Sequence, residues 1–199
     1  KGAEITQKYK KKNYKVVVVS SAISGVTNEL IKKAKEISEN FSDSEYDVLV
    51  SSGEQVACSL IAGRLIHKGL KSRSWLAWQI PILTDGSYKN SRIHKINKNK
   101  ILNYLAKGGI PIITGFQGIN NEDRVTTIGR GGSDASAIVL AKFLKAERCI
   151  IYTDVEGVFT TDPNKLNKAK KIKVISYEEM LEMASLGAKV MQPVSIQDA

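Results

Sequence analysis

A short glycine-rich segment carries one arginine and one aspartate into an apolar run. Residues 127–136 read TIGRGGSDAS, and residues 135–144 continue as ASAIVLAKFL. Glycine permits positive φ angles and leaves backbone N–H groups uncovered. The segment therefore predicts a tight turn that leads directly into a helix. The glycines of this turn are Gly129, Gly131 and Gly132.

The residue types around this turn predict an anion-binding site. Ser133 and Asp134 occupy the positions expected for a helix N-cap. The free N–H groups and the positive dipole end of a helix favour phosphate or carboxylate, and Arg130 adds a planar fork suited to bidentate carboxylate binding. An ordinary capped loop is the alternative interpretation, because such caps are common.

Strands and helices alternate along the chain, which favours an α/β fold with a mainly parallel sheet and helices on both faces. Gly53 is expected in a turn, and a polar loop is expected over residues 85–99, followed by a hairpin-like stretch to residue 124. The predicted strands are residues 16–20, 47–51, 74–78, 110–114 and 149–153. The predicted helices start at Thr27, span residues 54–67, 97–107 and 135–144, and start again at a capping box formed by Ser176 and Glu179.

Polar residues follow several of these predicted strands. In open α/β sheets ligands bind beyond the carboxyl ends of the strands, so these residues predict one shared cleft. They are Ser20 and Ser21, residues 51–54, residues 114–117, and Thr153 with Asp154. Within the helix over residues 54–67, the side chains expected to face inward are Val56, Leu60, Ile61 and Leu65.

Length and composition fit one globular domain. The chain has 199 residues, of which 42% are hydrophobic, and it contains no apolar run as long as a membrane span. A cytoplasmic protein without a membrane partner is therefore expected. Cys58 and Cys149 lie among apolar neighbours without a C-x-x-C pattern, so both are interpreted as core residues, and neither a disulfide nor a metal site is expected. Trp75 and Trp78 are likewise interpreted as core or interface aromatics.

The formal net charge of +10 raises the alternative of nucleic-acid binding. The lysines and arginines concentrate before residue 16, over residues 89–100 and over residues 165–173. Few aromatic residues accompany them, and no RNP, helix-turn-helix or zinc-finger pattern is present. These charges are interpreted as solvated surface.

The anion-binding turn also suits phosphoryl transfer, which needs N–H groups and cations around the phosphates. The sequence has no G-x-x-x-x-G-K-[ST] P-loop and no H-R-D or D-F-G motif. If the chain binds ATP, a different kinase fold is required.

A series of ordered motifs over almost the whole chain resembles the aspartate kinases of the amino acid kinase superfamily. Each motif alone is weak, but their order and spacing make the resemblance specific. The motifs are VVVVSSA at residues 16–22 with Thr27, SGEQ at 52–55, TDG at 84–86 with Arg92 and Ile93, GFQG at 115–118, TIGRGGSD at 127–134, YTDVEGVFTTDP at 152–163, ISYEEMLEMA at 175–184 and GAKV at 187–190.

This resemblance implies a three-layer α/β/α sandwich and ATP-dependent phosphorylation of the L-aspartate side-chain carboxylate. ATP with Mg²⁺ would be the cosubstrate, and a homodimer is a family expectation. Arg130 would grip a substrate carboxylate, Glu54 would meet the substrate ammonium, and Asp134 would organise charge near the transferring group. The substrate-binding residues would be Ser21, Thr27, Glu54, Arg130, Gly131, Gly132 and Ser133. The ATP-binding residues would be Ser21, Thr153, Asp154, Phe159, Asn164, Lys189 and Val190.

Structural roles remain open for several of these residues. Glu54 could be an acid favoured by a helix dipole, and Lys189 an exposed cation at a helix end. Ser21 and Thr27 could be turn and cap residues, and Thr153 with Asp154 could end a strand in an Asx-type turn.

The sequence departs from the resembled family in a few places. The family's first strand and Lys-x-Gly-Gly loop have no counterpart in residues 1–199. The chain is therefore expected to be a catalytic domain truncated at both ends, impaired in catalysis by itself and without the C-terminal ACT regulatory domains. Phe159 stands where the family has tyrosine, and Asn164 where it commonly has arginine. Alternative functions are a non-catalytic binding module and a sibling kinase acting on another acceptor.

Overall fold

The computed structural model describes residues 2–153, 157–162, 165–186 and 196–197. Its helices are α1 (Gly2–Lys11), α2 (Val26–Ile37), α3 (Asp43–His67), α4 (Asn99–Ala106), α5 (Gly132–Leu144) and α6 (Tyr177–Ser185). Its strands are β1 (Val18–Ser20), β2 (Ser72–Trp75), β3 (Ile82–Thr84), β4 (Ile93–Ile96), β5 (Ile110–Thr114), β6 (Gln117–Ile119) and β7 (Val125–Thr127). Within these ranges, no helix combines the length and the apolar character needed to span a membrane.

A parallel three-stranded sheet in the order β1-β5-β2 forms the centre of the fold. Val18 of β1 pairs with Ile112 of β5, and Ser72 of β2 pairs with Ile110. Every residue of β5 is buried, as is typical of a central parallel strand covered on both faces. This sheet confirms the α/β class and the parallel pairing that the sequence predicts.

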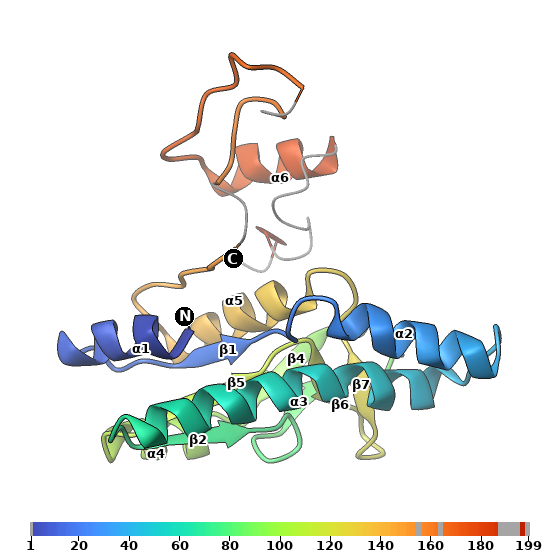
Figure 1. Ribbon diagram of the computed structural model, residues 1–199, viewed down its shortest axis with the longest axis horizontal. Coiled ribbons are helices and arrows are strands. Elements are labelled where there is room, and N and C mark those ends of the chain that lie inside the picture. The colour runs from blue at the N-terminus through green and yellow to red at the C-terminus, as the bar shows by residue number, and fades with distance from the viewer. Residues whose placement is uncertain (1, 154–156, 163–164, 187–195, 198–199) are drawn as a thin grey trace.

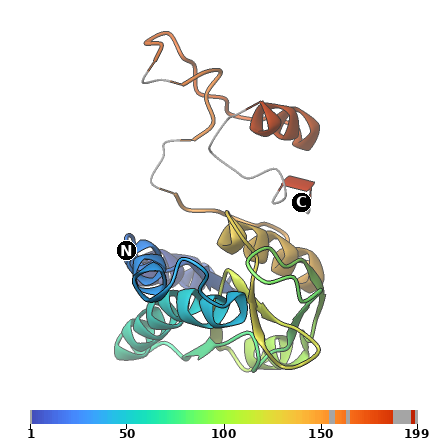
Figure 2. The ribbon, with the colours of Figure 1, turned by 90° about the vertical axis from the view of Figure 1, so that its right-hand side faces the viewer.

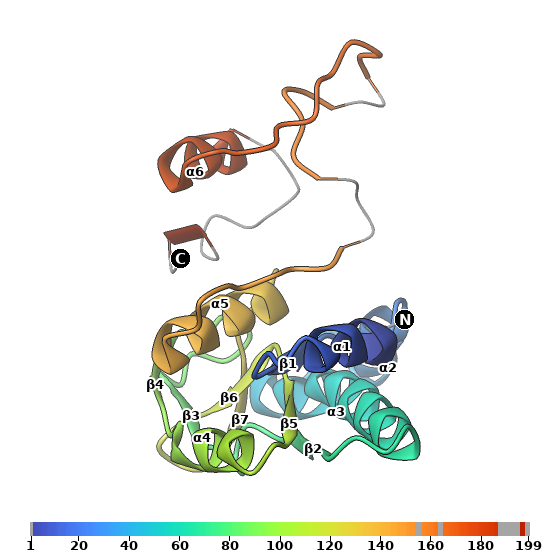
Figure 3. The ribbon, with the colours of Figure 1, turned by 90° about the vertical axis from the view of Figure 1, so that its left-hand side faces the viewer.

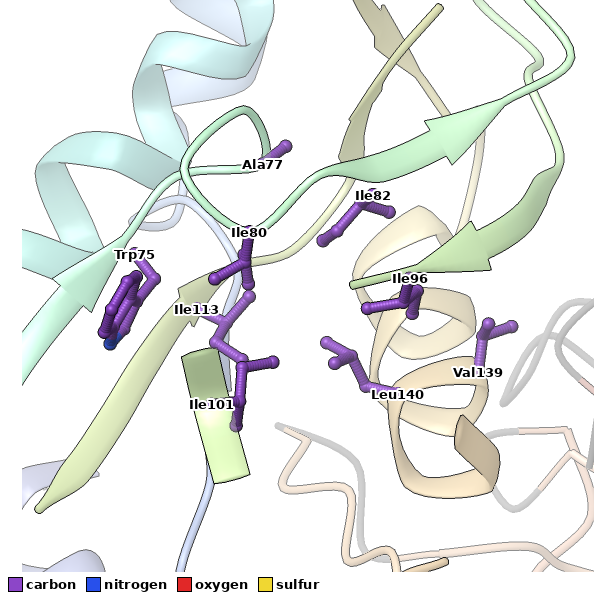
Figure 4. Packing of buried hydrophobic residues seen from close by; sticks show 9 residues of the cluster. All are labelled: Trp75, Ala77, Ile80, Ile82, Ile96, Ile101, Ile113, Val139 and Leu140. Atoms are coloured by element: carbon purple, nitrogen blue, oxygen red, sulfur yellow. The ribbon is translucent and has the colours of Figure 1, made fainter. Parts of the chain in front are cut away.

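Alternating side chains of β5 separate two hydrophobic clusters, because successive residues of a strand point to opposite faces. Ile112 packs on one face with Cys58 and Leu65 of α3. Ile113 packs on the other face with Ile101 of α4 and with α5, as Figure 4 shows. Helices therefore cover both faces of the sheet (Figures 1 and 3), which confirms the three-layer arrangement.

A second sheet in the order β4-β3-β6-β7 continues the structure beyond β5. Leu83 of β3 pairs in parallel with Ile119, whereas the pairs β3 with β4 and β6 with β7 are antiparallel. The hairpin-like stretch after β5 is thus the β6-β7 hairpin. The prediction of a polar loop over residues 85–99 is wrong in part, because β4 lies within this segment.

The predicted strand over residues 47–51 is wrong, because these residues belong to the 25-residue helix α3. The run Val-Leu-Val favours a strand locally, but tertiary packing outweighs such a preference. The hydroxyls of Ser51 and Ser52 donate to the carbonyls of Val48 and Leu49 and so are satisfied within the helix. Gly53 accordingly lies inside the helix and not in a turn.

Burial along α3 and β2 also differs from the prediction at single residues. Leu65 is buried as expected, but Val56 and Leu60 are exposed, because α3 carries apolar residues on most sides and not on one stripe. Trp75 lies in the core, one of the two roles expected for it, and Trp78 is 55% exposed. The predicted strand over residues 74–78 extends too far, because β2 ends at Trp75.

The predicted buried strand over residues 149–153 is wrong as well. These residues form no strand in the described structure, and Cys149 is exposed, unlike Cys58. Local β-propensity cannot make a strand without a neighbouring strand to pair with.

The described part beyond residue 157 has a small hydrophobic cluster of its own. Met180 and Ala184 of α6 pack with Ile196 and Val158. Figures 1 and 2 show α6 on the far side of α5 from the parallel sheet. The predicted capping box is confirmed: Ser176 Oγ accepts from the Glu179 N–H, and Glu179 Oε2 accepts from the Ser176 N–H.

Candidate active site

The carboxyl ends of β1 and β5 lie side by side and bring two loops together. Ser20 pairs with Thr114, and the Gly115 N–H donates to the Ser20 carbonyl at 3.0 Å. Ser21 follows β1 and is exposed, while Thr27 is half-buried in the first turn of α2. The structure therefore places Ser21 at the sheet edge where the sequence predicts a cleft.

Glu54 reaches this edge from α3. Its carboxylate oxygen Oε1 accepts a hydrogen bond of 3.1 Å from the N–H of Ala22, in the loop after β1. The side chain is 3% exposed, and its second oxygen, Oε2, has no hydrogen-bond partner among the described residues. Burial raises the pKa of Glu54 to about 7. A buried acceptor left open in this way suits a ligand that brings a positive charge or a donor.

The thiol of Cys58 lies one helical turn beyond Glu54 and is fully buried. Burial, reinforced by the negative charge of Glu54, raises the pKa of Cys58 to about 12. Cys58 therefore stays a neutral thiol at physiological pH and is no nucleophile.

The start of α5 packs directly against the loop that follows β5. A Cβ on Gly115 would lie 3.0 Å from Ser133, and a Cβ on Gly132 would lie 2.7 Å from the Phe116 ring. The Phe116 N–H also donates to Ser136 Oγ at 3.0 Å. Because Gly115 follows Thr114 and bonds to Ser20, the first turn of α5 shares one sheet edge with Ala22, the partner of Glu54.

The glycine turn before α5 has the geometry of an open helix N-terminus. Gly131 is the N-cap residue with φ 70°, and no side chain caps the helix. The expectation that Ser133 or Asp134 is the N-cap is therefore wrong, because the glycine at the left-handed position starts the helix earlier. Arg130 is exposed and forms no ion pair with another described residue. An uncapped helix start beside an arginine provides donors for an anionic ligand.

Asp134 lies in the first turn of α5 and is half-buried. Its pKa is raised above the ordinary value because burial disfavours the charged form. The pKa of Cys149 is raised first by burial and second by the charge of Asp134. The candidate site thus contains the carboxylates of Glu54 and Asp134, whose pKa values burial raises, and the exposed guanidinium of Arg130.

The structure also reveals polar residues that the sequence interpretation missed. Asp47 is fully buried in α3 and accepts hydrogen bonds from Thr127 and from the backbone of Lys89. Gln117 is buried and donates through Nε2 to the Ser51 carbonyl. An aspartate next to an apolar run is a signal that could have pointed to Asp47, since unpaired buried carboxylates are rare.

Of the candidate nucleotide-binding residues, Ser21 lies at this sheet edge, whereas the others lie on other segments or outside the described structure. Thr153 is exposed, and Phe159 is half-buried in an isolated antiparallel bridge with Lys171. Asp154, Asn164, Lys189 and Val190 lie outside the described residues. Across the described ranges, no group of three or more histidine, cysteine or acidic side chains could hold a metal ion. The structure therefore brings the loop of Ser21, the Glu54 carboxylate and the start of α5 with Ser133 and Asp134 to one sheet edge.

Known proteins with similar sequences are aspartokinases. The chain is 50% identical over 189 residues to the aspartokinase of Rickettsia felis. These residues cover 94% of this chain and 47% of that protein. It is 50% identical over 184 residues to the aspartokinase of Geobacillus stearothermophilus, covering 92% of this chain and 45% of the relative. The chain thus spans about half the length of the curated relatives it matches.

Solved structures agree with this likeness. Aspartate kinase from Synechocystis superposes with a TM-score of 0.84 at 38% identity, covering 99% of this chain and 32% of that one. Aspartokinase III from E. coli in complex with aspartate and ADP superposes with a TM-score of 0.83 at 28% identity, covering 92% of this chain and 52% of the other. The amino acid kinase family model matches residues 2–197. The chain belongs to the amino acid kinase family.

Proposed function

We propose that the protein is an aspartate kinase, which transfers the γ-phosphoryl group of ATP to the side-chain carboxylate of L-aspartate. The observation that carries the proposal is the buried Glu54 carboxylate with an open oxygen, on the same sheet edge as the uncapped, arginine-bearing start of α5. The relatives named aspartokinase support the same activity.

The charges of this site complement those of L-aspartate, which carries one ammonium and two carboxylates. The ammonium would bind Glu54, whose open oxygen would gain a charged donor and whose anionic form would be stabilised. Arg130 would bind one carboxylate through its guanidinium fork. Gly131 and Ser133 would offer backbone N–H groups at the start of α5, whereas the Gly132 N–H already donates to the Gly129 carbonyl at 3.0 Å, so Gly132 would only let the backbone approach the ligand closely. Ser21 and Thr27 would contribute hydroxyl groups at the edge of the loop after β1.

Asp134 would act by organising charge and not as a base. The accepting carboxylate of L-aspartate carries no proton near pH 7, so no proton has to be removed from it. Arg130 and the start of α5 would stabilise the negative charge that spreads over the transferring group.

ATP and Mg²⁺ would be required as cosubstrate and cofactor. The N-terminus of α5 suits a phosphate, because no side chain caps it. Mg²⁺ would be held by the phosphates of ATP together with one or two protein carboxylates, as is usual for this ion. The nucleotide residues would be Ser21, Thr153, Asp154, Phe159, Asn164, Lys189 and Val190.

Residues 1–199 would form the amino acid kinase catalytic domain of a homodimeric enzyme that acts in the first step of lysine, threonine and methionine synthesis. The cytoplasmic location expected from the sequence stays a prediction.

The test is ATP- and Mg²⁺-dependent formation of aspartyl hydroxamate by the full-length gene product in the presence of hydroxylamine. L-Glutamate and UMP serve as competing acceptors, with ADP release as the common readout. Arg130→Ala should lower kcat/KM for L-aspartate by about a hundredfold or more, because a charge-assisted bidentate contact is lost. Arg64→Ala, which removes an exposed arginine in the last turn of α3, is the matched control.

Two results would contradict the proposal. ADP release with another acceptor but not with L-aspartate would keep the kinase fold and change the substrate. A folded protein that releases no ADP with any acceptor would favour the non-catalytic binding module.

A further inference from the structure

The carboxylate of Asp47 accepts hydrogen bonds from two segments that are far apart in the sequence. Its Oδ2 accepts from the Thr127 N–H at 2.8 Å, and its Oδ1 accepts from the Thr127 hydroxyl at 2.8 Å. The Lys89 N–H lies 3.0 Å from Oδ2 and 3.2 Å from Oδ1. Asp47 is fully buried in α3, so these donors replace the water that the carboxylate loses on folding.

Both segments lead to the glycine turn of the candidate active site. Thr127 is the last residue of β7, and Arg130 follows it by three residues. The Ser91 N–H donates to the Thr127 carbonyl at 2.8 Å, which joins the loop of Lys89 to the end of β7. Asp47 and Ser91 therefore hold Thr127 from two directions.

The loop of Lys89 also supports the turn itself. Gly129 has φ 80°, and a Cβ built on it would lie 2.8 Å from Asn90 Oδ1 and 3.1 Å from the Lys89 carbonyl. The same loop is tied to α3 a second time, because Lys89 Nζ pairs with Asp43. The turn thus rests on a loop whose backbone is anchored by Asp47.

We propose that Asp47 is a positioning residue for Arg130: its buried carboxylate holds both Thr127 and the loop under Gly129, and so sets where the guanidinium meets the substrate carboxylate. This inference rests on the proposed function of Arg130. Asp47 itself would touch neither substrate nor nucleotide. A displacement of about 1 Å in a binding group is enough to cost up to a hundredfold in rate.

The test is a double-mutant cycle between Asp47→Asn and Arg130→Ala, read as KM for L-aspartate, kcat and melting temperature. Asparagine replaces one accepting oxygen by an NH₂ group that would face N–H donors, so the clamp is lost at nearly constant volume. Asp47→Asn should raise KM for L-aspartate by about tenfold or more. In the Arg130→Ala background the same change should have no further effect on KM.

Ser72→Ala is the matched control for a purely structural effect. It removes another buried hydrogen bond, from Ser72 Oγ to the Ile110 carbonyl at 3.0 Å, at the opposite end of the parallel sheet. It should lower the melting temperature and leave KM unchanged. Thr127→Val, which removes only one of the hydrogen bonds to Asp47, keeps the test possible if Asp47→Asn does not fold, and should raise KM by about two- to fivefold.

Three results would overturn the inference. One is a lower melting temperature of Asp47→Asn with an unchanged KM. Another is a double variant whose KM increase equals the product of the single increases, which would mean that Asp47 acts independently of Arg130. The third is an unchanged KM and kcat in Arg130→Ala, which would remove the proposed role of Arg130 and so distinguish failure of the proposed function from failure of this inference.

Discussion

Gly53 of α3 lies so close to Ala22 that a Cβ built on the glycine would come within 2.9 Å of the Ala22 Cβ. Side chains essentially never approach so closely, so only glycine fits at this position without a shift of the backbone. The contact brings the loop after β1 against α3, where the next residue, Glu54, accepts the Ala22 N–H. A glycine within a helix costs about 1 kcal/mol relative to alanine, and the close approach of Ala22 requires it here.

Gly53→Ala should therefore displace the Ala22 loop and weaken L-aspartate binding. We expect KM for L-aspartate to rise about tenfold, because the hydrogen bond from the Ala22 N–H to Glu54 is strained. The effect on kcat should be smaller. Steady-state kinetics of the variant would measure this.

Gly63→Ala is the control within the same helix. A Cβ at Gly63 meets nothing within 4 Å. This variant should gain up to about 1 kcal/mol of stability from helix propensity with unchanged KM. Equal kinetics for the two variants would contradict a special role for Gly53.

Glu54 should make stability and substrate binding depend on pH. Burial raises its pKa from 4.5 in water to about 7, so the folded protein binds this proton more tightly than the unfolded chain. Protonated Glu54 therefore stabilises the folded state fully below about pH 4.5, and this stabilisation is lost as the pH rises through about 7. Urea unfolding should show that Glu54→Gln, which cannot ionise, gains stability relative to the wild type over this range.

If the chain binds L-aspartate as proposed, binding should release a proton from Glu54 below pH 7, because the ammonium of this ligand favours the carboxylate. Calorimetry at pH 6 in buffers of different ionisation enthalpy would count that proton. Glu54→Gln should bind weakly and release none. Equal proton release by both proteins would assign the proton to another group.

The two cysteines should differ sharply toward thiol reagents. Cys58 is fully buried with a pKa near 12. Cys149 is exposed as a residue, and partial desolvation of its thiol and the charge of Asp134 raise its pKa. Native protein should react with one equivalent of dithionitrobenzoate, faster at pH 9 than at pH 7, and with two equivalents in denaturant. Cys149→Ser should abolish the native reaction, and a persistent native equivalent would show that Cys58 is accessible.

Ile113 of β5 should be a major contributor to stability. It is fully buried among Ile101, Trp75 and α5 (Figure 4), so Ile113→Ala should cost about 2–5 kcal/mol in the free energy of unfolding. Ile37→Ala should change stability by less than about 0.5 kcal/mol, because Ile37 is 75% exposed. Similar losses in denaturant unfolding would argue against the described core.

Local chemistry in the sequence determined much of this protein. The glycines before α5 predict a turn with positive φ, and Gly129 and Gly131 adopt it, because few other residues tolerate that conformation. Ser176 and Glu179 form the expected capping box, since both partners lie within four residues. The parallel direction of the central sheet followed from the alternation of strands and helices, whereas the pairing of β1 with β5 is visible only in the structure.

Only the tertiary structure decided the features that depend on distant contacts. The Val-Leu-Val run after Asp47 favours a strand locally, yet the packing of α3 against the parallel sheet makes it helical. The partners of Asp47 lie 42 and 80 residues away in sequence. Glu54 and Arg130 could be named from residue types, but the open oxygen of Glu54 and the support under the turn arise only where separate loops meet, because burial is a property of the assembled fold.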